Sequence, residues 1–202
     1  MASKRSLSKE AQVQRRKHMA ERATGASRPG VSVGPTSEFS LFFRVKPGHG
    51  DALREALRAL QTHPGYRPGE YHMAIATIHE ARFVLFDDDT RLLFATSFDG
   101  SWDAYMDDFA TSGPTLQLFD AIFQHAEGYE GLPDTAAVKG LVLGAQATAA
   151  AYARNYPGTV KEIRKALRVN KAFQQVLDDP EAATVLQQPA LKPLLDEASD
   201  SS

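Results

Sequence analysis

Alternating hydrophobic and polar residues predict a β-hairpin near the middle of this 202-residue chain. Two runs rich in β-forming residues extend over His72–Phe86 and Arg91–Phe98. Between them lies Asp87-Asp88-Asp89-Thr90, a composition typical of a turn. The hairpin predicts that the fold contains an antiparallel sheet.

The side chains of the first run divide between two faces, because a strand has a period of two. We expect one face to carry Ile75, Thr77, His79, Ala81, Phe83 and Leu85. We expect the opposite face to carry Ile78, Glu80, Arg82, Val84 and Phe86.

Further elements are predicted on both sides of the hairpin. Before it, 39–46 is a compact strand and 51–62 is a helix with one apolar stripe. After it, Ser101 is placed to cap a helix over 102–110, and a further helix is expected over 114–125. The order so far is β-α-β-β-α, which lacks one strand of a split βαβ arrangement.

The alanine-rich segment Ala147–Arg154 is the candidate for the missing strand. Alanine favours helix by propensity, but a strand here completes the β-α-β-β-α-β order, so we predict a strand. Pro157-Gly158 stops this element, and a new helix begins at Thr159. The predicted fold class is therefore α+β, ferredoxin-like, with additional C-terminal helices.

Charge and composition predict three regions: a tail over 1–36, a domain over 37–180 and an acidic helical tail over 181–202. Residues 1–34 hold eight Lys/Arg and two Glu, whereas the rest holds fifteen Lys/Arg and twenty-three Asp/Glu. The first tail has few large apolar residues, which favours disorder. It is either an arm that contacts an acidic partner or a solubilising tail.

Composition excludes several classes of function. The chain has no Cys, so disulfides, thiolate catalysis and Cys-ligated metals are excluded. We find no run of about 18 apolar residues, so no transmembrane segment is predicted. The amino terminus has no apolar run behind its basic residues, so it is not a secretory signal, and a cytoplasmic location is expected.

Two motifs resemble a known superfamily. The strand motif Thr77-Ile78-His79-Glu80-Ala81-Arg82-Phe83 is followed by a phenylalanine-aspartate-glycine turn, Phe98-Asp99-Gly100, into a helix. With the order of elements over about 39–178, this resembles the ferredoxin-like dimeric α/β barrel superfamily, closest to an uncharacterised bacterial group. The superfamily includes antibiotic-biosynthesis-type monooxygenases, chlorite dismutases and dye-decolorising peroxidases. Asp99-Gly100 matches the end of the Gly-x-x-Asp-Gly motif of those peroxidases, although Thr96 stands where the glycine belongs.

The resemblance implies an oxidoreductase of haem-dependent peroxidase or monooxygenase type, acting on a small hydrophobic molecule. His79 is the candidate ligand for haem iron or another metal, and His125 is its rival. Arg82, Glu80 and Asp99 are the candidate catalytic residues, with Arg82 polarising an oxygen species. The alternatives are a hydrogen-bonded structural His79, a Glu80–Arg82 ion pair and a capping Asp99.

Other groups have structural interpretations. Trp102, Tyr105 and Phe109 follow at helical spacing, which is typical of core. Asp87-Asp88-Asp89 lacks the further ligands of a calcium loop, so we interpret it as a solvated turn.

One face of a ferredoxin-like sheet is left uncovered by its helices, and pairing of two such faces would bury it. We therefore predict a homodimer with an apolar cavity. Two further functions remain open: a cofactor-free monooxygenase or isomerase, and a non-catalytic ligand-binding or interaction module with a basic docking tail.

Overall fold

The computed structural model describes residues 32–131 and 135–199. Contacts divide the chain into two compact units, 1–160 and 161–202. Most of the predicted basic tail lies outside the described residues. The predicted domain boundaries at 36 and 180 stay predictions.

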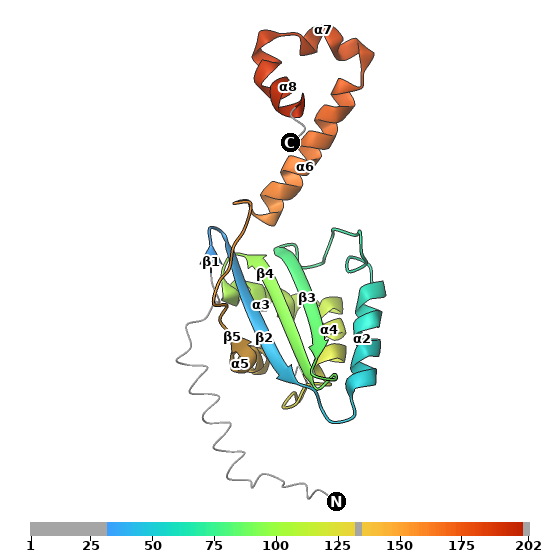
Figure 1. Cartoon of the computed structure of the whole chain (residues 1–202), viewed down its shortest axis with the longest axis vertical. Coiled ribbons are helices and arrows are strands. Elements are labelled where there is room, and N and C mark those ends of the chain that lie inside the picture. Colours follow the sequence, from blue (N-terminus) through green and yellow to red (C-terminus); the bar gives the residue numbers. More distant parts are fainter. Residues whose placement is uncertain (1–31, 132–134, 200–202) are drawn as a thin grey trace, which may run out of the picture. The chain divides into compact units, whose positions relative to one another are not determined.

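The first unit is built on an antiparallel sheet of five strands, as the hairpin pattern predicts (Figure 1). Its strands are β1 (Ser32–Val33), β2 (Thr36–Arg44), β3 (Ile78–Phe86), β4 (Arg91–Asp99) and β5 (Gln146–Ala147). The strands follow the order β1-β2-β4-β3, and β5 pairs with β2. This antiparallel order is compatible with a ferredoxin-like α+β fold, and β3 lies at one edge of the sheet.

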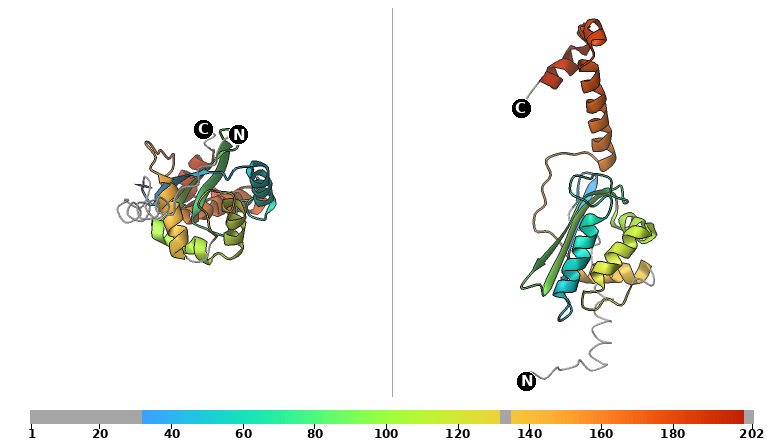
Figure 2. Two further views of the ribbon diagram at one scale, coloured as in Figure 1. Left: turned by 90° about the horizontal axis from the view of Figure 1, so that it is seen from below. Right: turned by 90° about the vertical axis from the view of Figure 1, so that its right-hand side faces the viewer.

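Four helices lie on one face of this sheet (Figures 1 and 2). They are α2 (Gly50–Thr62), α3 (Trp102–Thr111), α4 (Pro114–Phe123) and α5 (Thr135–Ala145). Ser101 caps α3 as expected, because its hydroxyl accepts a hydrogen bond from the Ala104 amide at 3.2 Å. Within the described residues, the opposite face of the sheet carries no helix of this unit, and we call it the open face.

Aromatic side chains dominate the core between sheet and helices. Phe39, Leu41 and Phe43 of β2 are buried, whereas Phe42 between them is 40% exposed on the open face. This alternation is the period-two pattern of a strand with one face on the core, and it agrees with the strand predicted over 39–46. The predicted core stripe of α3 is also confirmed, since Trp102, Tyr105 and Phe109 are all buried.

The predicted strand over Ala147–Arg154 is wrong except at its first residue. In place of the expected fourth strand there is only the two-residue strand β5, in which Ala147 pairs with Ser40 and Gln146 pairs with Leu41. Residues 148–159 then leave the sheet without regular structure. The pattern of an alanine-rich segment contains little information about where pairing ends, because small side chains fit a strand, a helix or a loop.

The predicted division of side chains along the first hairpin strand is wrong at its beginning. The pairing of β3 with β4 shifts between Ile78 and Glu80, as in a β-bulge. Ile78 is therefore buried in the core with Phe83, while His79 contacts residues of the open face. A bulge adds one residue on one strand, and strict alternation cannot predict it.

The second unit contains one long helix and several short ones. After the long helix α6 (Val160–Leu177) come η1 (Pro180–Ala182), α7 (Ala183–Leu186), η2 (Pro189–Leu191) and α8 (Lys192–Ser199). None of the residues 161–199 is buried. Among the described residues, no helix has the length and apolar character needed to cross a membrane.

Candidate functional site

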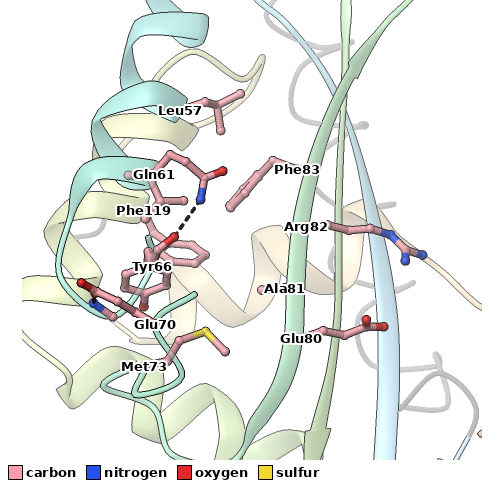
Figure 3. A pocket seen from close by; sticks show the side chains of 12 residues that line it. Leu57, Gln61, Tyr66, Glu70, Met73, Glu80, Ala81, Arg82, Phe83 and Phe119 are labelled. Atoms are coloured by element: carbon pink, nitrogen blue, oxygen red, sulfur yellow. Dashed lines mark hydrogen bonds between the residues drawn. The ribbon is translucent and has the colours of Figure 1, made fainter. Parts of the chain in front are cut away.

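A groove of about 400 Å³ lies between α2 and the edge strand β3 (Figure 3). Its apolar walls come from α2, β3, α4 and the loop that joins α2 to β3. The lining side chains include Leu57, Leu60, Tyr66, Met73, Ala81, Phe83 and Phe119. A cavity of this size and character is typical of small-molecule sites.

Hydrogen bonds hold the loop that forms one end of the groove. The Gln61 side-chain amide donates to the carbonyl of Tyr66 at 2.7 Å, and the Gly65 amide donates to Glu70 Oε2 at 2.6 Å. Gly65 has φ +86°, and a Cβ atom there would lie 3.0 Å from the carbonyl oxygen of His72. Glycine is therefore required at this turn, which places the Tyr66 ring in the groove wall.

Polar groups are few in the groove. Gln61 and Glu70 lie on its rim, and the hydroxyl of Tyr66 is buried. Burial raises the pKa of Tyr66, so this phenol stays protonated at neutral pH. The groove can therefore hold an apolar body, with a few hydrogen-bonding groups to orient it.

Glu80 and Arg82, two of the residues predicted to be catalytic, do not point into this groove. Both are exposed, and Figure 3 shows their side chains projecting from β3 away from Tyr66 and Met73. They lie on the open face because they alternate with Ala81 and Phe83. The sequence pattern correctly placed Glu80 and Arg82 on the face of the strand opposite to Ala81 and Phe83. The groove lies on the face that carries Ala81 and Phe83.

His79 and Asp99, by contrast, meet at one end of the open face. His79 Nε2 lies 2.7 Å from Asp99 Oδ1, and their side chains are 5% and 13% exposed. The hydroxyl of Thr36 donates to the same carboxylate oxygen at 3.2 Å and lies 3.2 Å from His79 Nε2. The three residues come from three neighbouring strands, so the β-sheet pairing brings them together.

The loop after β5 covers this cluster. Arg154 donates to the Thr36 hydroxyl and to the Gly158 carbonyl, and its guanidinium carbon lies 4.9 Å from the centre of the Tyr156 ring. The Val160 amide donates to Asp99 Oδ2 at 2.7 Å. Figure 2 shows this loop on the side of the sheet opposite the helices. We call residues 148–159 the strap, and Thr36, His79, Asp99 and Arg154 the clasp.

Thr36, Arg154 and Tyr156 were missed from the sequence. No sequence pattern marks Arg154 and Tyr156, whose cation–π contact is seen only in the fold. Their partners are distant in sequence, so only the fold identifies them.

The clasp has the properties of a structural network. Asp99 accepts hydrogen bonds from the Val160 amide, directly after the strap, and from Thr36 of the sheet, and the His79 side chain is almost fully covered. Buried polar groups joined in this way fix the position of a segment. The alternative of a hydrogen-bonded structural His79 accounts for this geometry.

Haem does not fit the residues around either predicted ligand. A haem ligand needs an imidazole nitrogen that faces a cavity wide enough for the macrocycle. His79 places Nε2 against Asp99, and His125 places Nδ1 3.0 Å from His49 Nδ1. Neither histidine lines the groove. Within the described residues, no group of three or more His, Cys, Asp or Glu side chains is arranged to hold a metal ion.

The contact of His125 with His49 joins the end of α4 to the beginning of α2. His125 is 9% exposed, and burial, with smaller effects of His49 and Lys46, lowers the pKa of His125 below its ordinary value of 6.5. Protonation of His125 is therefore less favourable in the folded chain than in the unfolded chain.

This difference predicts an acid-sensitive stability. Since the unfolded chain binds the extra proton first, the free energy of unfolding falls as the pH drops from above 6.5 through the lowered pKa of His125. Urea denaturation at pH 7.5 and pH 5.0 measures the loss. In His125→Gln the loss becomes smaller, whereas in the control His72→Gln, whose side chain is 67% exposed, it is unchanged. An equal loss in all three proteins would contradict the assignment.

Comparisons with known proteins identify no relative. The chain matches no family model, no curated protein and no solved structure. The superfamily resemblance therefore stays a hypothesis, and the proposal below rests on the groove.

Proposed function

We propose that this protein binds a small, largely apolar molecule in the groove between α2 and β3. The observation that carries the proposal is the groove itself, about 400 Å³ in volume and walled by aromatic and aliphatic side chains. Such a volume is in the range of ligand sites, and a few polar groups at the rim are enough to orient a ligand. The proposal needs no haem.

The polar groups indicate the kind of ligand. Glu70 offers carboxylate oxygens at the rim of the groove, so a ligand with one hydroxyl or amine donor is favoured. The remaining lining suits one or two rings, because Phe83 and Phe119 present aromatic surface. An apolar, one- or two-ring molecule with a single donor group is the expected class.

A titration with 2-naphthol, which has two rings and one hydroxyl donor, tests the proposal. We expect saturable one-site binding to the full chain, detected by the change in naphthol fluorescence. In Ala81→Trp the binding is expected to weaken at least tenfold, because the indole occupies the middle of the groove. Circular dichroism checks that this variant folds, and Leu57→Asp provides a second change at the groove wall.

Arg82→Ala is the matched control. It lies next to Ala81 in sequence, but its side chain projects from the other side of β3 (Figure 3). Binding of 2-naphthol is expected to be unchanged in this variant. Non-saturable binding to the wild type, or equal binding in the folded Ala81→Trp and Leu57→Asp variants, would show that the groove is not a ligand site.

The oxidoreductase reaction implied by the resemblance stays a hypothesis for this groove, as does a cofactor-free reaction. The barrel formed by two facing sheets also stays a hypothesis. It is supported by an apolar row across the open face, in which Leu93 pairs with both Phe42 and Val84. Phe42 and Val84 are 40% and 42% exposed. The strap occupies one end of that face, which leaves this row as the surface for a second sheet.

A further inference from the structure

Helix α6 presents a broad apolar face that the described residues of its own unit cover only in part. Apolar residues recur at spacings of three and four along the helix, which places them on one side. Three of them are well exposed: Leu167 at 63%, Val169 at 58% and Val176 at 44%. The apolar positions are Ile163, Ala166, Leu167, Val169, Phe173, Val176 and Leu177.

The helices that follow α6 cover this face only in part. Phe173, Leu177, Leu186 and Leu195 are half-buried, and no residue of 161–199 is buried. Val185 and Leu194 remain 60% and 45% exposed. A unit of about 40 residues without a closed core is marginal alone, so a partner that covers the apolar face would stabilise it.

Charge is divided within the same unit. Helix α6 carries five Lys/Arg against one Glu, whereas 178–199 carries five Asp/Glu against one Lys. The basic residues of α6 lie together on the side of the helix away from the apolar face. They are Lys161, Arg164, Lys165, Arg168 and Lys171. The unit therefore carries two surfaces of opposite charge.

We propose that a second copy of this chain docks on α6, with the two 161–199 units burying their apolar faces against each other. In a two-fold arrangement the basic surface of each α6 can meet the acidic 178–199 segment of its partner. Each copy then contributes one basic surface, on α6, and one acidic surface, on 178–199. This interface differs from the facing sheets of the homodimer predicted from sequence, because it is formed by the C-terminal helices.

A second copy fits this surface better than a polyanion does. A nucleic acid or an anionic membrane would be attracted by α6 but repelled by the acidic segment beside it in sequence. The balance of charge within the unit leaves no net attraction for such a partner. The apolar positions also require an apolar partner surface, which the same unit of another copy provides.

Sedimentation equilibrium of the full chain tests the proposal. We expect the wild type to be a dimer at micromolar concentration and Leu167→Lys/Val176→Lys to be a monomer. Val84→Lys, on the open face of the sheet, is the matched control and is expected to remain a dimer. Circular dichroism shows whether the double variant keeps its helices.

A charge reversal gives an independent test. Lys165→Glu/Arg168→Glu is expected to weaken the dimer at least tenfold at low salt, and adding Asp196→Lys/Glu197→Lys to the same chain is expected to restore it. A monomeric wild type would overturn the proposal. A dimer that dissociates in Val84→Lys but not in Leu167→Lys/Val176→Lys would also overturn it, and would indicate a dimer of facing sheets. Binding of 2-naphthol in these variants reports on the groove separately.

Discussion

Replacing Asp99 by alanine is expected to lower the free energy of unfolding by about 3 kcal/mol, because the clasp then contains unpaired buried donors. Asp99 accepts hydrogen bonds from Thr36 and from the Val160 amide, and its carboxylate lies against His79. The strap is expected to loosen in the same variant. Urea denaturation measures the first effect, and faster hydrogen exchange at the Val160 amide reports the second.

Asp108→Ala is the control for Asp99→Ala, since Asp108 is an exposed residue of α3. Its expected change is within about 0.5 kcal/mol. Arg154→Leu provides a milder test of the same contact, because it releases the strap without leaving the Asp99 carboxylate unpaired. Unchanged exchange at Val160 in both Asp99→Ala and Arg154→Leu would show that the clasp does not hold the strap.

Replacing Phe119 by alanine is expected to cost about 4 kcal/mol of unfolding free energy, through lost burial and the cavity left behind. Phe119 is 1% exposed, and its ring centre lies 4.4 Å from that of Phe109 and 5.6 Å from that of Phe94. Its ring also forms part of the groove wall. Urea denaturation measures the stability, and naphthol titration is expected to show weaker binding.

Phe42→Ala is the matched control, with the same change of side chain at a site 40% exposed on the open face. The expected loss is below about 1 kcal/mol, because less area is removed from contact. Similar losses for Phe119→Ala and Phe42→Ala would contradict the assignment of the core to the helix-covered face.

Local patterns predicted most of the secondary structure. The hairpin, the helix at Ser101 and the buried alternation of Phe39, Leu41 and Phe43 all follow from residues close in sequence. Periodicity is reliable there because each side chain meets the same core along one regular element. The predicted fourth strand was wrong because the strand was placed to complete the β-α-β-β-α-β order, against the low preference of alanine for strands.

The candidate site was harder to predict. His79 and Asp99 were singled out for chemistry, and the structure brings them within 2.7 Å of each other, but under a strap that holds them in a structural network. The β-bulge before Glu80 changed the face on which His79 lies. Arg82 and Glu80 stayed where alternation put them, on the side of β3 away from the groove (Figure 3).

The amino-acid sequence by itself determined the α+β class, the hairpin, the core stripe of α3 and the division of charge along the chain. These depend on neighbours within a few residues, whose periodicity and propensity act locally. Only the tertiary structure decided that Thr36, His79, Asp99 and Arg154 meet, and that α2 and β3 enclose a groove. Such contacts join residues as far apart as Thr36 and Arg154, and they depend on strand register and loop path, which local patterns leave open.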